Sequence, residues 1–268
     1  MKSRVITGVF FVTVMLISIL SGPYFFSVFF LILSILSLDE FYRLFKNTDI
    51  RPNRILGFLL ALFIFVSVIL FYLLEQTFIY FLFLIPCIII IIVSELYRKK
   101  QTPIHNMAYT IFGVLYTVVP FCFFYAMAFS EAGYSIKYPL GFLILLWSTD
   151  TGAYLFGIKF GKHKLFERHS PKKTWEGFAG GFLTSLLAAG TFNFFLSDPD
   201  LINWLTISSI IVISGSFGDL SESMLKRSLS VKDSGTILPG HGGLLDRFDG
   251  LFLAAPLVFV YLQIVKAY

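Results

Sequence analysis

Nine apolar runs dominate the sequence, and each is close to the length that crosses a bilayer. The hydrocarbon core is about 30 Å thick, so a transmembrane helix takes about 20 mostly apolar residues. The chain is 57% hydrophobic and 14% charged, whereas soluble domains average about 25% charged residues. These features predict an all-α, polytopic integral membrane protein. The expected spans are roughly 5–21, 23–38, 55–74, 78–95, 108–129, 139–158, 177–196, 203–222 and 250–267.

The basic residues predict how these spans are oriented. All of the 21 Lys and Arg residues except Lys137 and Lys266 fall at the N-terminus or in alternate interhelical segments. The positive-inside rule places such segments in the cytoplasm. We therefore expect a multi-pass protein of the cell membrane (inner or plasma membrane) with a cytoplasmic N-terminus. Nine spans would place the C-terminus outside.

The two halves of the sequence differ in their polar content. Residues 1–130 are simple spans with short turns, whereas residues 140–250 hold both long loops and most of the polar groups within spans. No flexible linker or repeat divides them, so we expect one membrane domain over 1–268, with 1–130 as N-terminal spans and 140–268 as the catalytic part. The net charge of +5 lies in loops. No soluble basic domain is present to bind nucleic acid.

The stretch from Ser223 to Asp249 concentrates charge and glycine in this otherwise apolar chain. Charge near a bilayer is costly and mainly marks function. Carboxylates bind hard metal ions, and Lys, Arg and glycine amides bind phosphate. If the span at 203–222 continues as a helix past Asp219, then Asp219, Glu222, Ser223 and Lys226 share one face. A structural ion pair is the alternative interpretation of that face.

The second part of this stretch holds a Gly-rich loop and two aspartates. Gly242 and Gly243 follow His241, and such a loop presents backbone N–H groups to an anion. His241 is either a catalytic base or a hydrogen-bond donor. Asp246 and Asp249 are three residues apart and would share a face at the start of the last helix.

Two upstream motifs also carry polar groups. Asp150 follows an apolar run, and an acid in such a place should face the protein interior or a wet cavity. Ala153, Gly157 and Gly161 repeat every four residues, which favours close helix packing. The segment Ser170 to Gly181 sets two lysines before a Gly-rich helix start. Helix N-termini favour anions, although a Lys pair also serves as a topology determinant or a contact to anionic lipid.

These motifs resemble one known family. The run S-x-L-K-R-x4-K-D-x-G-x2-L-P-x-H-G-G-L-x-D-R-F-D from Ser223 to Asp249 is similar to the signature of the phosphatidate cytidylyltransferases (CDP-diacylglycerol synthases). The upstream D-T-G-A-Y and S-P-K-K-T-W-E-G also resemble that family. The resemblance covers about 140–250 in detail and the other spans in hydropathy only.

The resemblance implies that CTP and phosphatidate react to give CDP-diacylglycerol and pyrophosphate, in phospholipid biosynthesis. It implies Mg²⁺ as a cofactor, with K⁺ as a candidate second cation, membrane lipids as partners, and a homodimer. We assign metal binding to Asp219, Asp246 and Asp249. Catalytic roles are assigned to Lys226, Arg227, Lys232, Asp233, His241 and Arg247. Substrate binding is assigned to Asp150, Ser170, Lys172, Lys173, Thr174, Glu176, Ser223, Gly242 and Gly243.

Two alternative functions stay open. A CTP-dependent lipid kinase acting on a polyprenol or phytol would share the nucleotide and a membrane acceptor, but the complete signature argues against it. An ion-coupled transporter would use Asp150 and Asp219 as ion sites. Transporters of this kind often contain repeated halves, and the sequence shows no repeat.

Overall fold

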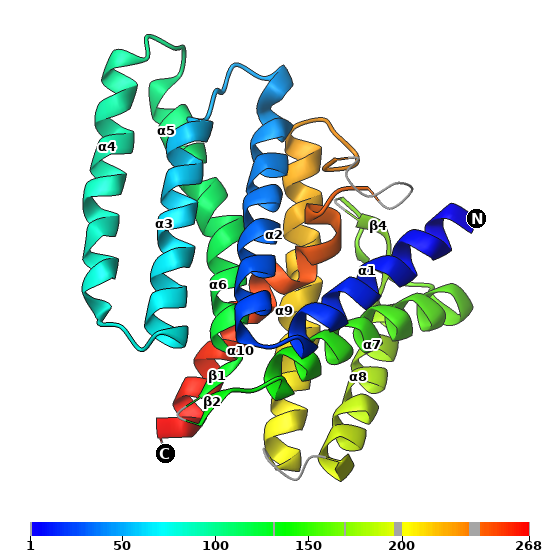
Figure 1. Cartoon of the computed structure of the whole chain (residues 1–268). Helices are drawn as coiled ribbons and strands as arrows, with labels where there is room; N and C mark the ends of the chain where they lie inside the picture. The colour runs from blue at the N-terminus through cyan, green and yellow to red at the C-terminus, as the bar shows by residue number, and fades with distance from the viewer. Residues whose placement is uncertain (1, 131, 169, 196–199, 236–241, 268) are drawn as a thin grey trace. The chain divides into compact units, whose positions relative to one another are not determined.

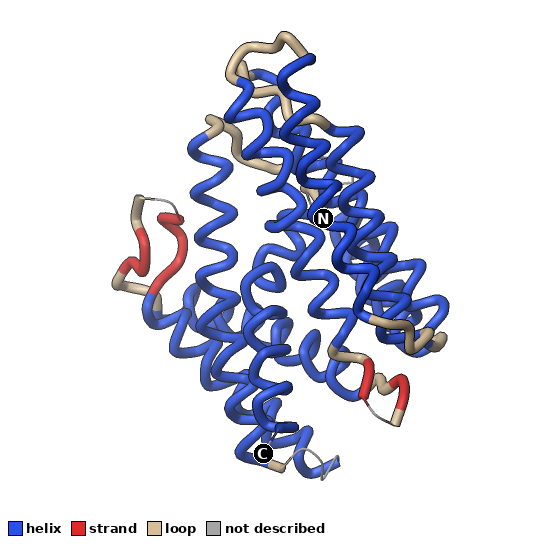
Figure 2. Tube along the Cα trace, turned by 90° about the vertical axis from the view of Figure 1, so that its left-hand side faces the viewer, coloured by secondary structure: helices blue, strands red, loops and turns tan. Residues whose placement is uncertain are grey.

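The computed structural model describes residues 2–130, 132–168, 170–195, 200–235 and 242–267, which are mostly helical (Figure 1). Strand is confined, among these residues, to two short hairpins (Figure 2). A helix satisfies the backbone hydrogen bonds of its interior residues within itself, which a bilayer requires because it offers no water. The fold therefore confirms the predicted all-α membrane class.

Eight helical segments of the described chain are long and apolar enough to cross a membrane. They match the second to ninth predicted spans. Helix α1 (Lys2–Leu20) covers the first predicted span, but its apolar part, Thr7–Leu20, is shorter than the other eight. The ninth crossing therefore stays a prediction. The eight segments are Pro23–Asn47, Arg54–Leu73, Phe78–Tyr97, Pro103–Ala126, Lys137–Phe160, Trp175–Phe195, Leu201–Ser228 and Leu245–Val265.

The chain forms two compact units. Unit 1 comprises Met1–Ser135 and Ser228–Arg247, and unit 2 comprises Ile136–Arg227 and Phe248–Tyr268. The signature stretch is thus divided, with its middle in unit 1 and its two ends in unit 2. Each unit is described by itself.

Unit 1 is built from the N-terminal helices around an aromatic core. Phe26, Phe30, Phe65, Phe121 and Tyr125 have side chains removed from the surface, and Ser27 Oγ lies 2.8 Å from the hydroxyl of Tyr125. Its elements are α1, α2 (Pro23–Arg43), η1 (Leu44–Asn47), α3 (Arg54–Leu73), η2 (Phe78–Phe83), α4 (Leu84–Tyr97), α5 (Pro103–Gly113), η3 (Val114–Val118), α6 (Val119–Ala126), β1 (Phe129–Ser130) and β2 (Gly133–Tyr134).

Proline explains an irregularity in one span of unit 1. The segment η3 between α5 and α6 is a π-helix, and Pro120 follows two residues after it. Proline has no backbone N–H and its ring crowds the carbonyl four residues earlier. Widening the preceding turn relieves that crowding without breaking the helix.

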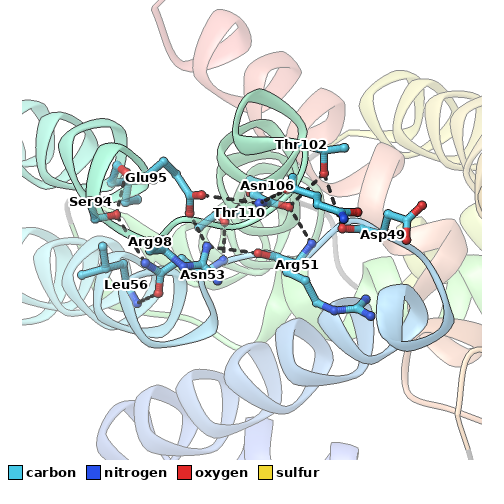
Figure 3. A network of polar contacts seen from close by, with 12 residues as sticks. Asp49, Arg51, Asn53, Leu56, Ser94, Glu95, Arg98, Thr102, Asn106 and Thr110 are labelled. Carbon is cyan, nitrogen blue, oxygen red and sulfur yellow. Dashed lines mark hydrogen bonds and ion pairs between the residues drawn. The ribbon is translucent and has the colours of Figure 1, made fainter.

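A polar network ties the loop before α3 to α4 and α5 (Figure 3). The side chain of Asn106 accepts a hydrogen bond from the backbone N–H of Arg51 at 2.6 Å, and Thr110 Oγ1 accepts one from the N–H of Asn53 at 2.7 Å. Arg98 donates to the carbonyl of Arg51 and forms an ion pair with Glu95. These mutually satisfied groups hold an irregular loop beside helices, where unpaired backbone groups would be costly.

Unit 2 is built from α7 (Lys137–Phe160), β3 (Lys164–Phe166), β4 (Ser170–Thr174), α8 (Trp175–Phe195), α9 (Leu201–Ser228) and most of α10 (Leu245–Ala267). Small residues let α7 and α8 approach closely. A Cβ on Gly177 would lie 2.9 Å from the carbonyl oxygen of Ala153 and 3.4 Å from Gly157 Cα. The predicted role in helix packing is therefore confirmed for Ala153 and Gly157, whereas Gly161 lies just after the end of α7 in extended backbone and contacts Thr174 of β4.

Two helix boundaries differ from the predicted spans in a way that matters for function. Helix α9 runs on to Ser228, past the predicted end at 222, and α10 begins at Leu245, before the predicted start at 250. Hydropathy underestimates the length of both helices because their additional turns carry charged residues. Because α9 continues as a helix past Asp219, Asp219 and Lys226 lie on one helical face, as predicted.

Candidate active site

The last turns of α9 carry a polar face in unit 2. Lys226 Nζ forms an ion pair with Glu222 Oε2 at 2.5 Å, and Glu222 is only 1% exposed. One turn earlier, Ser223 Oγ donates to Asp219 Oδ1 at 3.3 Å. The face predicted from the spacing therefore exists, and its members contact one another along the helix. The ion pair that was the alternative interpretation is also present, between Lys226 and Glu222.

A further carboxylate, Asp249 of α10, adds negative charge near this face. Asp249 in α10 experiences electrostatic repulsion from Asp219, Glu222 and Asp150, which come from α9 and α7. Gly218 lets α10 pack closely against α9, since a Cβ at this position would clash with the carbonyl oxygen of Asp249. We call Asp150, Asp219, Glu222 and Asp249 the carboxylate group.

The strand β4 delivers a cation to the carboxylate group. Lys173 Nζ lies 2.6 Å from Asp219 Oδ2 and 3.4 Å from the carbonyl oxygen of Ser216. Lys172 is exposed, because successive side chains of a strand point to opposite faces. The structure thus separates the predicted Lys pair and brings Lys173, together with Asp219, into one contact.

The remaining predicted residues of this hairpin shape the start of α8. Thr174 is buried, and its Oγ1 accepts a hydrogen bond from the N–H of Gly177 at 3.1 Å, as an N-cap does. Glu176 accepts hydrogen bonds from the N–H groups of Lys162 and His163 and from the His163 ring. Ser170 is half-buried at the start of β4. Glu176 and Thr174 therefore hold the hairpin on α8.

In unit 1 the signature stretch is organised by Asp246. Its Oδ2 accepts hydrogen bonds from Ser234 N at 3.1 Å, Ser234 Oγ at 2.9 Å and Gly243 N at 2.9 Å. The N–H of Gly243, predicted to bind phosphate, thus donates to Asp246 in this structure. Gly242 has φ of 82°, a left-handed conformation that glycine adopts without strain.

A buried glutamate that sequence reasoning missed completes this arrangement. Glu40 of α2 is 1% exposed and accepts hydrogen bonds from Leu244 N at 2.8 Å and Leu245 N at 3.1 Å. Ser234 Oγ also donates to it. The available signal was an acidic pair, Asp39 and Glu40, directly after the apolar run that ends at Leu38; an acid in such a place indicates function.

Four predicted catalytic residues are exposed in the structure: Arg227, Lys232, Asp233 and Arg247. Exposure suits cations that meet a soluble substrate, since their charge stays hydrated until binding. His241 lies outside the described residues.

The donor set of the carboxylate group is compatible with a hard metal ion. Among the described residues, no three His, Cys, Asp or Glu side chains converge tightly enough to enclose a metal ion by themselves. Mg²⁺ in nucleotide enzymes is usually held by one or two carboxylates together with substrate phosphates and water. Asp219 and Asp249 offer oxygen ligands of that kind, and their mutual repulsion would be relieved by a cation.

Comparisons with known proteins agree with this chemistry. The sequence model described as "Cytidylyltransferase family" matches residues 2–265. A "Phosphatidate cytidylyltransferase" of Staphylococcus haemolyticus (strain JCSC1435) is 43% identical over 166 residues, which are 61% of this chain and 62% of that protein's length. Proteins with the same name from Staphylococcus epidermidis (strain ATCC 12228 / FDA PCI 1200) and Staphylococcus aureus (strain COL) are 41% and 40% identical over 181 residues, 67% of this chain and 68% of theirs.

Proposed function

The chain belongs to the cytidylyltransferase family, and we propose that it transfers the cytidylyl group of CTP to phosphatidate, giving CDP-diacylglycerol and pyrophosphate. The observation that carries this proposal is the carboxylate group with Lys173 paired to Asp219. It supplies oxygen ligands and a cation side by side, as transfer of a nucleotidyl group requires. The relatives named as phosphatidate cytidylyltransferases support the choice of acceptor.

The reaction needs no protein nucleophile. A phosphate oxygen of phosphatidate attacks the α-phosphorus of CTP, and the bond to the β-phosphate breaks to release pyrophosphate. The protein therefore acts by positioning the substrates and by stabilising charge in the transition state. Lys173 and Lys226 would exchange their carboxylate partners for phosphate oxygens, and Arg227, Lys232 and Arg247 would bind phosphates at the surface.

We propose Mg²⁺ as the cofactor, with K⁺ as a candidate second cation. Asp219 and Asp249 would hold a cation in unit 2, and Asp246 offers a further carboxylate in unit 1. When bound, the metal ion would neutralise the oxygens of CTP and of the leaving pyrophosphate. Ser223 would orient Asp219 through its hydrogen bond to that carboxylate, and Asp150 would add negative charge near Asp249.

The proposed setting is the plasma membrane, with the site facing the cytoplasm and the protein acting as a homodimer. The placement of the basic residues on alternate interhelical segments supports this orientation. CTP is a cytoplasmic metabolite, so a site on that side would have access to it. Phosphatidate would reach the site from the surrounding bilayer.

A double-label assay on the purified full-length protein tests the proposal. We expect label from α-³²P-CTP, but not from γ-³²P-CTP, to become soluble in chloroform when phosphatidate and Mg²⁺ are present. Transfer of the γ-label to a polyprenol or phytol would instead identify a lipid kinase. Absence of transfer from either label by folded protein would refute both enzymatic functions and leave the transporter.

A further inference from the structure

Glu40 occupies an unusual electrostatic environment. It is 1% exposed, near the end of α2. Within the described residues, its carboxylate accepts hydrogen bonds from two backbone N–H groups and one hydroxyl. Its neighbour Asp39 instead forms ion pairs with Arg43 and Arg54. Burying a carboxylate is costly unless it is strongly hydrogen-bonded. The backbone N–H groups that Glu40 binds therefore indicate which part of the fold this residue stabilises.

That part is the first turn of α10. Leu245 is the first residue of this helix, and its N–H and that of Leu244 belong to the groups that a helix leaves without internal partners. A carboxylate at this place is favoured by both the free N–H groups and the helix dipole. The side chain of Glu40 therefore caps the N-terminus of α10, although it comes from a helix about 200 residues earlier in the sequence.

Ser234 connects this cap to Asp246. Its Oγ lies within hydrogen-bonding distance of Glu40 Oε1 and of Asp246 Oδ2, the latter at 2.9 Å. A hydroxyl has one hydrogen and both carboxylates are acceptors, so Glu40 and Asp246 share the single hydrogen of Ser234. Any movement of Glu40 would thus change both the backbone before Asp246 and the partner of its side chain.

Two glycines of the signature are explained by the same residue. A Cβ on Gly243 would collide with Glu40 Oε1 and with Ser234 Oγ, and a Cβ on Gly235 would lie 2.8 Å from Glu40 Cδ. Both positions therefore need glycine for space around Glu40.

We propose that Glu40 is a positioning residue, which fixes the start of α10 and the carboxylate of Asp246 for catalysis. This inference rests on the proposed function and adds a residue from the N-terminal spans to it. Glu40 does not touch substrate in this role. Loss of a group that orients a ligating carboxylate typically costs 10–100-fold in metal affinity or activity.

The test compares Glu40→Gln with Glu95→Gln, a matched exchange at another buried glutamate of unit 1. Glutamine at 40 replaces one carboxylate oxygen by an amide NH₂ group, so a donor would face a backbone N–H donor. We expect kcat to fall at least about 10-fold, the KM for CTP to change less than about threefold, and the Mg²⁺ concentration for half activity to rise. Glu95→Gln should keep kcat within about twofold of the wild-type value. Ser234→Ala, which keeps the cap on α10, should give an intermediate loss.

Hydrogen exchange gives a readout that does not depend on activity. Glu40→Gln should speed amide exchange in residues 242–250, whereas Glu95→Gln should not. Unchanged exchange there, or accelerated exchange with wild-type kcat and Mg²⁺ dependence, would overturn the role of Glu40. An inactive wild-type protein would refute the proposed function instead, and an inactive Glu95→Gln variant that remains folded would show that the effect is not specific to Glu40.

Discussion

The polar network of unit 1 and the carboxylate group of unit 2 both hold acidic side chains within a membrane protein, but they balance charge differently. In the network, Glu95 pairs with Arg98 and accepts a hydrogen bond from Asn106. In the carboxylate group, Lys173 and Lys226 pair with Asp219 and Glu222, but Asp249 is repelled by Asp219, Glu222 and Asp150. Complementary groups stabilise a fold, whereas clustered like charges lower its stability and are retained for a ligand. The comparison predicts that the polar network is structural and that the carboxylate group is functional.

The largest expected effect is at the centre of the carboxylate group. Asp249→Asn should lower kcat by at least about 100-fold, since it removes a charge that would face the metal and phosphates. It should also raise the unfolding temperature of the ligand-free protein, by roughly 3 °C for each kcal/mol of repulsion removed. The hydrogen bond from Gly250 N to Oδ1 is kept by asparagine.

Activity is measured by transfer of the α-label, and unfolding by a thiol-reactive dye, since Cys122 is buried. Activity near the wild-type level would remove Asp249 from the site. A lower unfolding temperature would show that its charge stabilises the fold.

A smaller loss is expected at the cation of this group. Lys173→Gln removes the partner of Asp219 and a ligand for phosphate, so kcat/KM should fall about 10- to 100-fold, mainly through the KM for CTP. The exposed neighbour Lys172 offers a matched control, and Lys172→Gln should change kcat/KM less than about threefold. Equal effects of the two exchanges would contradict the specific role of Lys173.

In the polar network the expected effect is on stability. Glu95→Gln leaves Arg98 without its charged partner, and breaking such a buried contact costs about 1–3 kcal/mol. The unfolding temperature should fall while kcat stays within about twofold of the wild-type value. A large loss of kcat in the folded variant would show that this network also serves catalysis.

The smallest effect is expected at Asp39. Its ion pairs with Arg43 and Arg54 involve largely exposed arginines, and such pairs contribute about 0–1 kcal/mol. Asp39→Asn should therefore leave both the unfolding temperature and kcat nearly unchanged. Glu40 is the adjacent residue. A strong loss of activity in Asp39→Asn would therefore indicate that any exchange at this end of α2 impairs the protein, and not that Glu40 has a specific role.

The sequence predicts much of the fold because hydropathy and helix period act locally. Eight spans coincide with helices, and the four-residue spacing of Ala153 and Gly157 correctly indicates a packed face. The shared face of Asp219 and Lys226 is predicted by the same period.

Long-range contacts limit what the sequence predicts about the site. The role of Glu40 depends on contacts with residues about 200 positions later, and no spacing rule encodes them. Lys172 and Lys173 form one motif in the sequence, but a strand turns their side chains to opposite faces. The division of the signature between two units likewise follows from tertiary packing.

The length of α9 indicates how deep in the bilayer the candidate site residues on this helix lie. Its 28 residues correspond to about 42 Å at 1.5 Å per residue, which exceeds a hydrocarbon core of about 30 Å. For a helix that starts at the opposite surface, Asp219 would lie about 27 Å along, near the boundary of the core, and Lys226 about 10 Å farther. That is the level of lipid head groups, so we expect a phosphatidate molecule to offer its phosphate without leaving its own leaflet.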